Sequence, residues 1–101
     1  ETEDSAIKLG IIVNYIEPSL KAQLNLENDA GVIINEIEEE SIAVKNGLQL
    51  YDIILSVNGN EVKNMWEFRR VIMDALKDKK EMEFLIVRKG QKQILKINKF
   101  D

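Results

Sequence analysis

The main constraint on the fold is one amphipathic helical segment, which begins at Asn64 and is predicted to end between residues 77 and 79. Asn64 and Glu67 have the spacing of a capping pair, because the Asn oxygen accepts from first-turn amides and the Glu reaches back. The apolar residues of the segment recur every three or four positions, on one helical face: Phe68, Val71, Ile72, Ala75 and Leu76. This face must be buried, so the rest of the chain has to supply the opposing surface.

Runs of β-branched and aliphatic residues supply that surface. They predict strands at about 8–14, 31–37, 51–57, 61–62, 82–88 and 91–97, with short helices at 17–24 and 42–46. Asn58-Gly59 predicts a tight hairpin turn, Ser41 caps the second short helix, and Gly47 ends it. The predicted order is β, short α, β, short α, β, β, α, β, β.

The length of 101 residues predicts a single domain able to fold without metal or disulfide. Residues 1–7 are mostly polar and acidic, and we interpret them as a linker or a frayed terminus before a single domain at 8–101. The chain starts without methionine, so we expect an excised fragment whose oligomerisation, if any, resides in missing parts of a parent protein.

Composition excludes several classes of function. The chain has no His, which removes the usual general base, the usual partner of a nucleophilic Ser and the commonest transition-metal ligand. We therefore predict no catalytic residue, metal or cofactor. The net charge of −4, with bases and acids interspersed, argues against nucleic acid, and no apolar run is long enough for direct membrane insertion. The lack of Cys leaves the compartment open.

The segment Leu9-Gly10-Ile11 opens an apolar strand with a glycine. Glycine adopts backbone conformations closed to other residues, so neighbouring N–H groups can converge on an anion while the strand offers an edge to another chain. Any strand that begins after a glycine produces the same pattern. The segment alone therefore leaves an anion-binding loop and an ordinary strand start as alternatives.

The block from Gly31 to Gly59 decides between them through a resemblance. A Gly-Val-Ile-Ile strand precedes a Ser-x-Ala-x-x-x-Gly-Leu helix, and an Asp-Ile-Ile strand and Val-Asn-Gly follow. The residues are Gly31, Ser41, Ala43, Gly47, Leu48, Asp52 to Ile54 and Val57 to Gly59. With the loop at Leu9 and the helix at Asn64, the block resembles a PDZ domain of the bacterial HtrA-type (DegP/DegQ-like) serine proteases, over residues 8–97.

The resemblance implies an α+β fold. It is a partly open β-barrel or sandwich of five to six strands, capped by one main and one or two short helices, in the permuted bacterial strand order. It also implies a non-catalytic module that binds extended or C-terminal peptides by adding them to a strand, for substrate recognition or regulation of an HtrA-like serine protease in the bacterial envelope or periplasm. The alternative is a docking or scaffolding PDZ domain of a secretion system or another protease class, without carboxylate recognition.

The resemblance also assigns a site. The peptide carboxylate would bind the loop of Lys8, Leu9, Gly10 and Ile11, and the peptide would pair with Ile11, Ile12 and Val13. The groove helix would contribute Met65, Arg69, Ile72 and Met73. Leu9, Ile11 and Ile72 would line a pocket for an apolar terminal residue, so that a lysine at position 11 would abolish binding and leave the fold intact.

The chain departs from the family pattern at a few places. Leu50-Tyr51 stands where these bacterial domains usually carry Pro-Gly, and Ile42 stands where they carry Pro at a helix start. We expect these changes to affect local rigidity rather than binding. Lys8 stands where the family often has Tyr, Glu or another large side chain, and a charge that acts on the bound carboxylate and an ordinary solvent-exposed cation are alternatives for it. For Arg69, an ordinary surface cation and a contact to an acidic ligand side chain remain equal alternatives.

Overall fold

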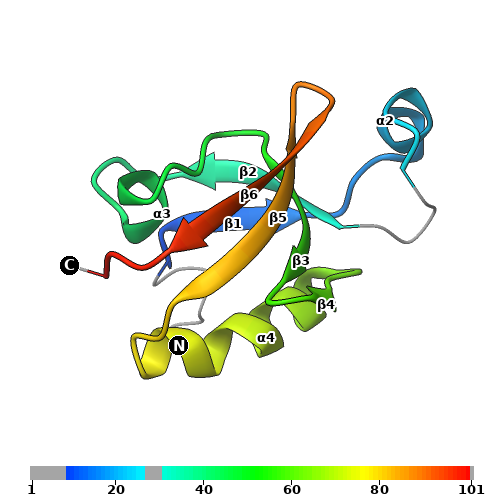
Figure 1. Cartoon of the computed structure of the whole chain (residues 1–101). Helices are drawn as coiled ribbons and strands as arrows, with labels where there is room; N and C mark the ends of the chain where they lie inside the picture. The colour runs from blue at the N-terminus through cyan, green and yellow to red at the C-terminus, as the bar shows by residue number, and fades with distance from the viewer. Residues whose placement is uncertain (1–8, 27–30, 101) are drawn as a thin grey trace.

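The computed structural model describes residues 9–26 and 31–100 (Figure 1). Its elements confirm the predicted order and an α+β fold. They are β1 (Ile11–Asn14), α2 (Pro18–Gln23), β2 (Val32–Ile37), α3 (Ile42–Lys45), β3 (Ile53–Val57), β4 (Asn60–Glu61), α4 (Met65–Lys77), β5 (Met82–Arg88) and β6 (Gln91–Ile97). Strand pairing is antiparallel throughout, in the order β1-β2-β3-β5-β6, with β4 beside β3. The sheet therefore ends in β1 on one side and β6 on the other.

Local capping signals form the bonds that their residue types predict. Ser41 Oγ accepts from the Val44 N–H at 3.2 Å, and Asn64 Oδ1 accepts from the Glu67 N–H at 2.9 Å. Glu67 reaches back one residue further than a capping box requires, because its Oε1 accepts from the Lys63 N–H at 3.0 Å. Such bonds join neighbours in the chain, which explains why the sequence alone predicts them.

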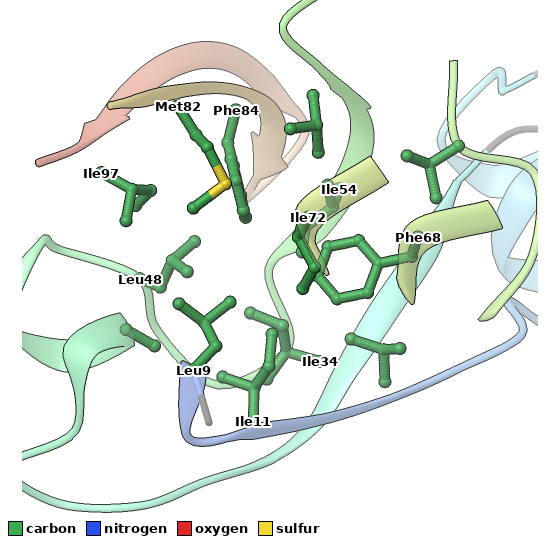
Figure 2. Packing of buried hydrophobic residues seen from close by; sticks show 14 of the residues in the cluster. Leu9, Ile11, Ile34, Leu48, Ile54, Phe68, Ile72, Met82, Phe84 and Ile97 are labelled. Carbon is green, nitrogen blue, oxygen red and sulfur yellow. The ribbon is translucent and has the colours of Figure 1, made fainter. Parts of the chain in front are cut away.

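The core lies between α4 and one face of the sheet. Phe68 and Ile72 of α4 are fully buried, and Figure 2 shows them pointing toward Ile34 and Ile54 of the sheet. The Phe68 ring meets Phe84 edge to face, with centroids 6.1 Å apart. Burial of each such side chain contributes about 1.5–3 kcal/mol to folding. The predicted apolar stripe is therefore the surface that attaches α4 to the sheet.

A smaller apolar cluster covers part of the opposite face of the sheet. Its buried members are Ile16, Ile53 and Val87. Half-buried leucines from α2 and the turn after it pack on this cluster. Helices thus lie on both faces, with α4 on the main core and α2 on the smaller cluster (Figure 1).

Two backbone details differ from the sequence expectation. The first strand starts at Ile11 rather than residue 8, because Leu9 is in a helical turn and Gly10 has a φ of +95°. Tyr51 has a φ of +72° at the position where the resembled family usually carries Gly. A left-handed conformation costs a residue with a Cβ about 1–2 kcal/mol, and the exposed Tyr51 side chain offers little packing to offset it. The effect of the Leu50-Tyr51 departure is thus on local strain.

Candidate functional site

The backbone of Ile11 faces the free edge of the sheet. The Gly10 carbonyl accepts from the Glu38 N–H at 2.9 Å, so Gly10 faces β2. Backbone polar groups alternate in direction along an antiparallel strand, and Ile11 pairs with Ile37 in the next register position. The N–H and C=O of Ile11 therefore point away from β2.

The backbone of Val13 points the same way. Its partner Ile34 donates to the Asp52 carbonyl at 2.9 Å and accepts from the Tyr51 N–H at 3.0 Å, so Ile34 faces the β3 side. Val13 and Ile34 are therefore a pair without mutual hydrogen bonds, in which both backbones face outward. Ile11 and Val13 are two residues apart on β1, so both face this edge, and the register shift after Ile12 lies on the β2 side, where Asn35 has no partner. Within the described ranges, no further strand lies beyond them.

The loop before β1 joins a helical residue to a residue with positive φ, a backbone combination that anion nests use. Leu9 has helical backbone and Gly10 a positive φ, and successive right- and left-handed residues turn their N–H groups toward one point. Gly10 also lies against α3, because a Cβ built on it would be 2.2 Å from the Ser41 Cβ. Lys8 lies outside the described residues. The loop is thus held by contact with the start of α3.

The three predicted pocket residues meet in one place. Leu9, Ile11 and Ile72 are each at most 1% exposed and belong to one apolar cluster, as Figure 2 shows. The expectation that Ile11→Lys leaves the fold intact is therefore wrong, because the substitution would place a charge in the core.

The other groove residues lie on the exposed flank of α4. Met65 is 39% exposed and Met73 48%, while Arg69 is half-buried between them along the helix. The Arg69 guanidinium carbon lies 4.9 Å from the ring centroid of Trp66, a cation–π distance. Stacking fixes the Arg69 guanidinium on the helix surface. Trp66, which received no site role from the sequence, thus positions one of the predicted groove residues.

An acidic flank beside the loop was missed in the sequence analysis. A hollow of about 280 Å³ lies over the start of β1 and the end of β2, and Glu36 and Glu38 line it together with Gly10, Ile11, Ile12 and Ile37. Both carboxylates are exposed. Like charges repel a bound carboxylate, so these groups oppose the anion nest. In the sequence, Glu36 lies in the predicted strand at 31–37, and the run Glu38-Glu39-Glu40 after it predicts only a solvated loop.

A buried ion pair supports the turn between α3 and β3. Arg88 Nε donates to Asp52 Oδ1 at 2.9 Å, and Arg88 Nη2 donates to Asp52 Oδ2 at 2.6 Å and to the Gly47 carbonyl at 2.8 Å. The hydrogen bonds to Asp52 raise the pKa of the Arg88 guanidinium. Asp52 also accepts from the Gln49 N–H at 2.9 Å. All of these contacts are structural, and none belongs to the groove.

Over residues 9–26 and 31–100, no group of three acidic side chains is arranged to hold a metal ion. The same ranges contain no helix with the length and apolarity that crossing a membrane requires. A hollow of about 560 Å³ lies on the face of the sheet opposite α4, lined by β3 to β6 and the turn after α2.

Both the sequence and the fold of this chain are similar to those of known proteins. Residues 7–98 match the family described as "PDZ domain". A relative named "Probable periplasmic serine endoprotease DegP-like" from Pseudomonas putida is 30% identical over 90 residues, which are 89% of this chain and 19% of the relative. The chain thus spans about a fifth of that relative's length. "Serine protease HtrA-like" from Staphylococcus haemolyticus is 23% identical, and the aligned region covers 85% of this chain and 13% of that relative.

Solved structures share the fold. A variant of the HtrA-type protease AlgW, solved with a decapeptide, has a TM-score of 0.80 at 23% identity. The match covers 89% of this chain and 27% of the AlgW chain. The HtrA3 PDZ domain bound to the phage-derived ligand FGRWV has a TM-score of 0.69 at 24% identity. The match covers 89% of this chain and 81% of the HtrA3 chain. These similarities show that the sheet and helices described above are arranged as in HtrA-type domains.

Proposed function

Because this chain belongs to the PDZ domain family, we propose that it is a non-catalytic module that binds an extended peptide as an added strand beside β1. The observation that carries the proposal is the outward direction of the Ile11 and Val13 backbones at a free sheet edge. Four backbone groups there can pair with any peptide. This contact supplies affinity without regard to sequence, and side chains supply selection.

We place the C-terminal carboxylate of the peptide at the nest of Leu9, Gly10 and Ile11, with Lys8 as a nearby positive charge. The terminal side chain would enter between Leu9, Ile11 and Ile72, whose aliphatic character favours an apolar residue. Because these side chains are buried, the terminal side chain of the peptide can enter only if they move apart. Ordering the peptide costs free energy as well, so we expect micromolar affinity, about −8 kcal/mol.

The parent protein is proposed to be an HtrA-type serine protease of the bacterial envelope, in which this module recognises substrate or regulates cleavage. Its support is that the relatives are named periplasmic serine endoproteases. A docking module without carboxylate recognition is the second candidate. The acidic flank at Glu36 and Glu38 favours it, because it opposes a bound carboxylate.

An amidation experiment separates the two candidates. The pentapeptide Phe-Gly-Arg-Trp-Val, seen on the HtrA3 domain, would be titrated as its free acid and as its C-terminal amide. Backbone amide shifts would be followed by NMR. We expect the acid to shift the amides of residues 9–13 and to bind at least about tenfold more tightly, since a charge-assisted bond contributes roughly 1.5–3 kcal/mol. Equal affinity of the two forms, with residues 9–13 unmoved, would support docking instead.

Arg69 is proposed to select the ligand residue two positions before the terminus. Side chains two apart on a strand share a face, so this residue and the terminal one both point toward α4. We expect Phe-Gly-Glu-Trp-Val to bind about fivefold more tightly than the Arg peptide, from roughly 1 kcal/mol of Coulomb energy in water. The preference should reverse in Arg69→Glu and persist in Arg70→Glu, an equal charge change on the adjacent residue. An unchanged preference in Arg69→Glu would show that Arg69 is only a surface cation.

A further inference from the structure

The sheet has a second free edge at β6. This strand pairs with β5 over all seven of its residues, and within residues 9–26 and 31–100 no strand lies on its other side. In Figure 1, β5 and β6 pass in front of β1 and β2, and in the strand order β6 is at the end of the sheet opposite β1. The edge of β6 is longer than that of β1, which has four residues.

Hydrogen bonding to the β5 neighbour shows which groups face this edge. The Glu83 carbonyl accepts from the Asn58 N–H at 2.8 Å, so Glu83 faces β3 rather than β6. Its partner Lys96 then faces outward, and by alternation so do Lys92 and Ile94. The next outward group, the N–H of Asn98, already donates to Asn46 Oδ1 at 2.9 Å. The open part of the edge is therefore residues 92–96.

The side chains of these three residues have a distinct chemistry. Lys92 and Lys96 are exposed on the face of the sheet opposite the main core, and Ile94 between them is 62% exposed. Residues 84–100 contain five of the 14 basic residues of the chain and none of the 18 acidic ones. An acidic domain thus carries two lysines with an apolar residue between them along this edge, and Glu83 of β5 lies opposite Lys96. Within the described ranges, the hollow opposite α4 reaches this edge at Lys92.

We propose that residues 92–96 of β6 bind a second extended protein segment, with acidic side chains on either side of an apolar one. Backbone pairing would use the outward N–H and C=O groups, and the acidic side chains would lie beside Lys92 and Lys96. The apolar side chain would cover Ile94. This site is independent of the groove at β1, and both can be occupied together.

Other occupants fit less well. Antiparallel pairing of two copies centred on Ile94 would place Lys92 opposite Lys96, and directly opposed like charges destabilise a strand pair. A phosphate polymer or an anionic membrane would neutralise the lysines and leave the backbone groups of the strand unpaired. Lysines also protect edge strands against aggregation, but a merely protective edge has no use for an exposed Ile at its centre. An extended acidic segment with an apolar centre would pair with the lysines, with the outward backbone groups and with the exposed Ile94.

The test uses a heptapeptide with both ends blocked, acetyl-Thr-Glu-Thr-Val-Thr-Glu-Thr-amide, which has no carboxylate for the loop at Gly10. We expect it to shift the amides of residues 92, 94 and 96 at lower peptide concentration than those of residues 11–13, where it can pair only through its backbone. Lys92→Glu/Lys96→Glu should weaken binding at least about tenfold, because two favourable charge pairs become repulsive. Lys77→Glu/Lys80→Glu changes the net charge equally away from β6 and should bind as the parent does.

A second probe separates strand pairing from simple anion binding. The same heptapeptide, N-methylated at Val and at the following Thr, keeps its charge and loses backbone donors, so its binding should be lost. Unchanged binding of the methylated peptide would overturn the proposal in favour of a general anion site, as would equal shifts with anionic vesicles. Absence of shifts in β6 with the parent peptide would show that the lysines only protect the edge. None of these outcomes bears on the groove at β1.

Discussion

Replacing Asp52 with alanine is expected to destabilise the domain by about 3–5 kcal/mol, as for other broken buried ion pairs. The carboxylate is 1% exposed and accepts both bonds of the Arg88 fork and the Gln49 N–H. Its removal leaves a partly buried guanidinium without a counter-charge and an amide without an acceptor. Urea unfolding followed by circular dichroism would measure the loss.

Controls show whether burial is the cause. Asp78 lies 3.9 Å from Lys80 in an exposed pair, so Asp78→Ala should change stability by no more than about 0.5 kcal/mol. Asp52→Leu combined with Arg88→Met should recover much of the loss, since an apolar pair replaces the charges. If Asp52→Ala lowered the free energy of unfolding by less than about 1 kcal/mol, the buried Asp52 carboxylate would not be important for stability.

The same pair should confer no pH dependence near neutrality. The pKa of Arg88 is raised in the folded state, so its contribution is complete below the unfolded-state pKa and is lost only as the pH rises through the folded value. Both values lie far above neutral pH. The difference between the parent and Asp52→Ala should therefore show no change due to Arg88 between pH 6 and 9.

Gly10→Ala is the second substitution with a large expected effect, a loss of about 2–5 kcal/mol. A side chain at a φ of +95° costs roughly 1–2 kcal/mol, and its Cβ would overlap Ser41 at 2.2 Å, which adds about 1–3. The loop would have to move away from α3, so the nest would lose its shape. Urea unfolding and titration with Phe-Gly-Arg-Trp-Val would both report the change.

Gly47→Ala is the matched control, because its φ is +99° while the nearest atom to a new Cβ is 3.8 Å away. Gly47→Ala should lower the free energy of unfolding only by the cost of a side chain at positive φ, about 1–2 kcal/mol. Adding Ser41→Gly to Gly10→Ala removes the overlapping Cβ and should recover the difference, since Gly is only slightly worse than Ser as a helix cap. Equal losses in Gly10→Ala and Gly47→Ala would show that the contact with Ser41 is unimportant.

Much of the fold was predictable because its signals are local. The Ser41 and Asn64 caps and the Asn58-Gly59 turn each join residues within four positions. The α4 stripe is a property of helical periodicity alone. The order of elements follows from such signals, and the block from Gly31 to Gly59 added the family resemblance that implies a site for a peptide.

Other features are decided by contacts between distant residues. Asp52 belongs to a motif that the sequence displays, yet its partner Arg88 lies 36 residues away, and only the β3–β5 register brings the two together. Gly10 needs to be glycine partly because Ser41 lies against it, which no local pattern indicates. Ile11 and Ile72 were correctly associated, but their complete burial depends on how α4 packs against β1.

The sequence by itself therefore determined the elements, their order and the class of fold, since these depend on the preferences of neighbouring residues. Only the tertiary structure decided that Ile11 and Val13 face one free edge and that Lys92, Ile94 and Lys96 face the other. The physical reason is that a strand's outward groups depend on which of its residues hydrogen-bond to the neighbouring strand. That pairing register depends on contacts between neighbouring strands, and no repeating pattern in the sequence of one strand reveals it.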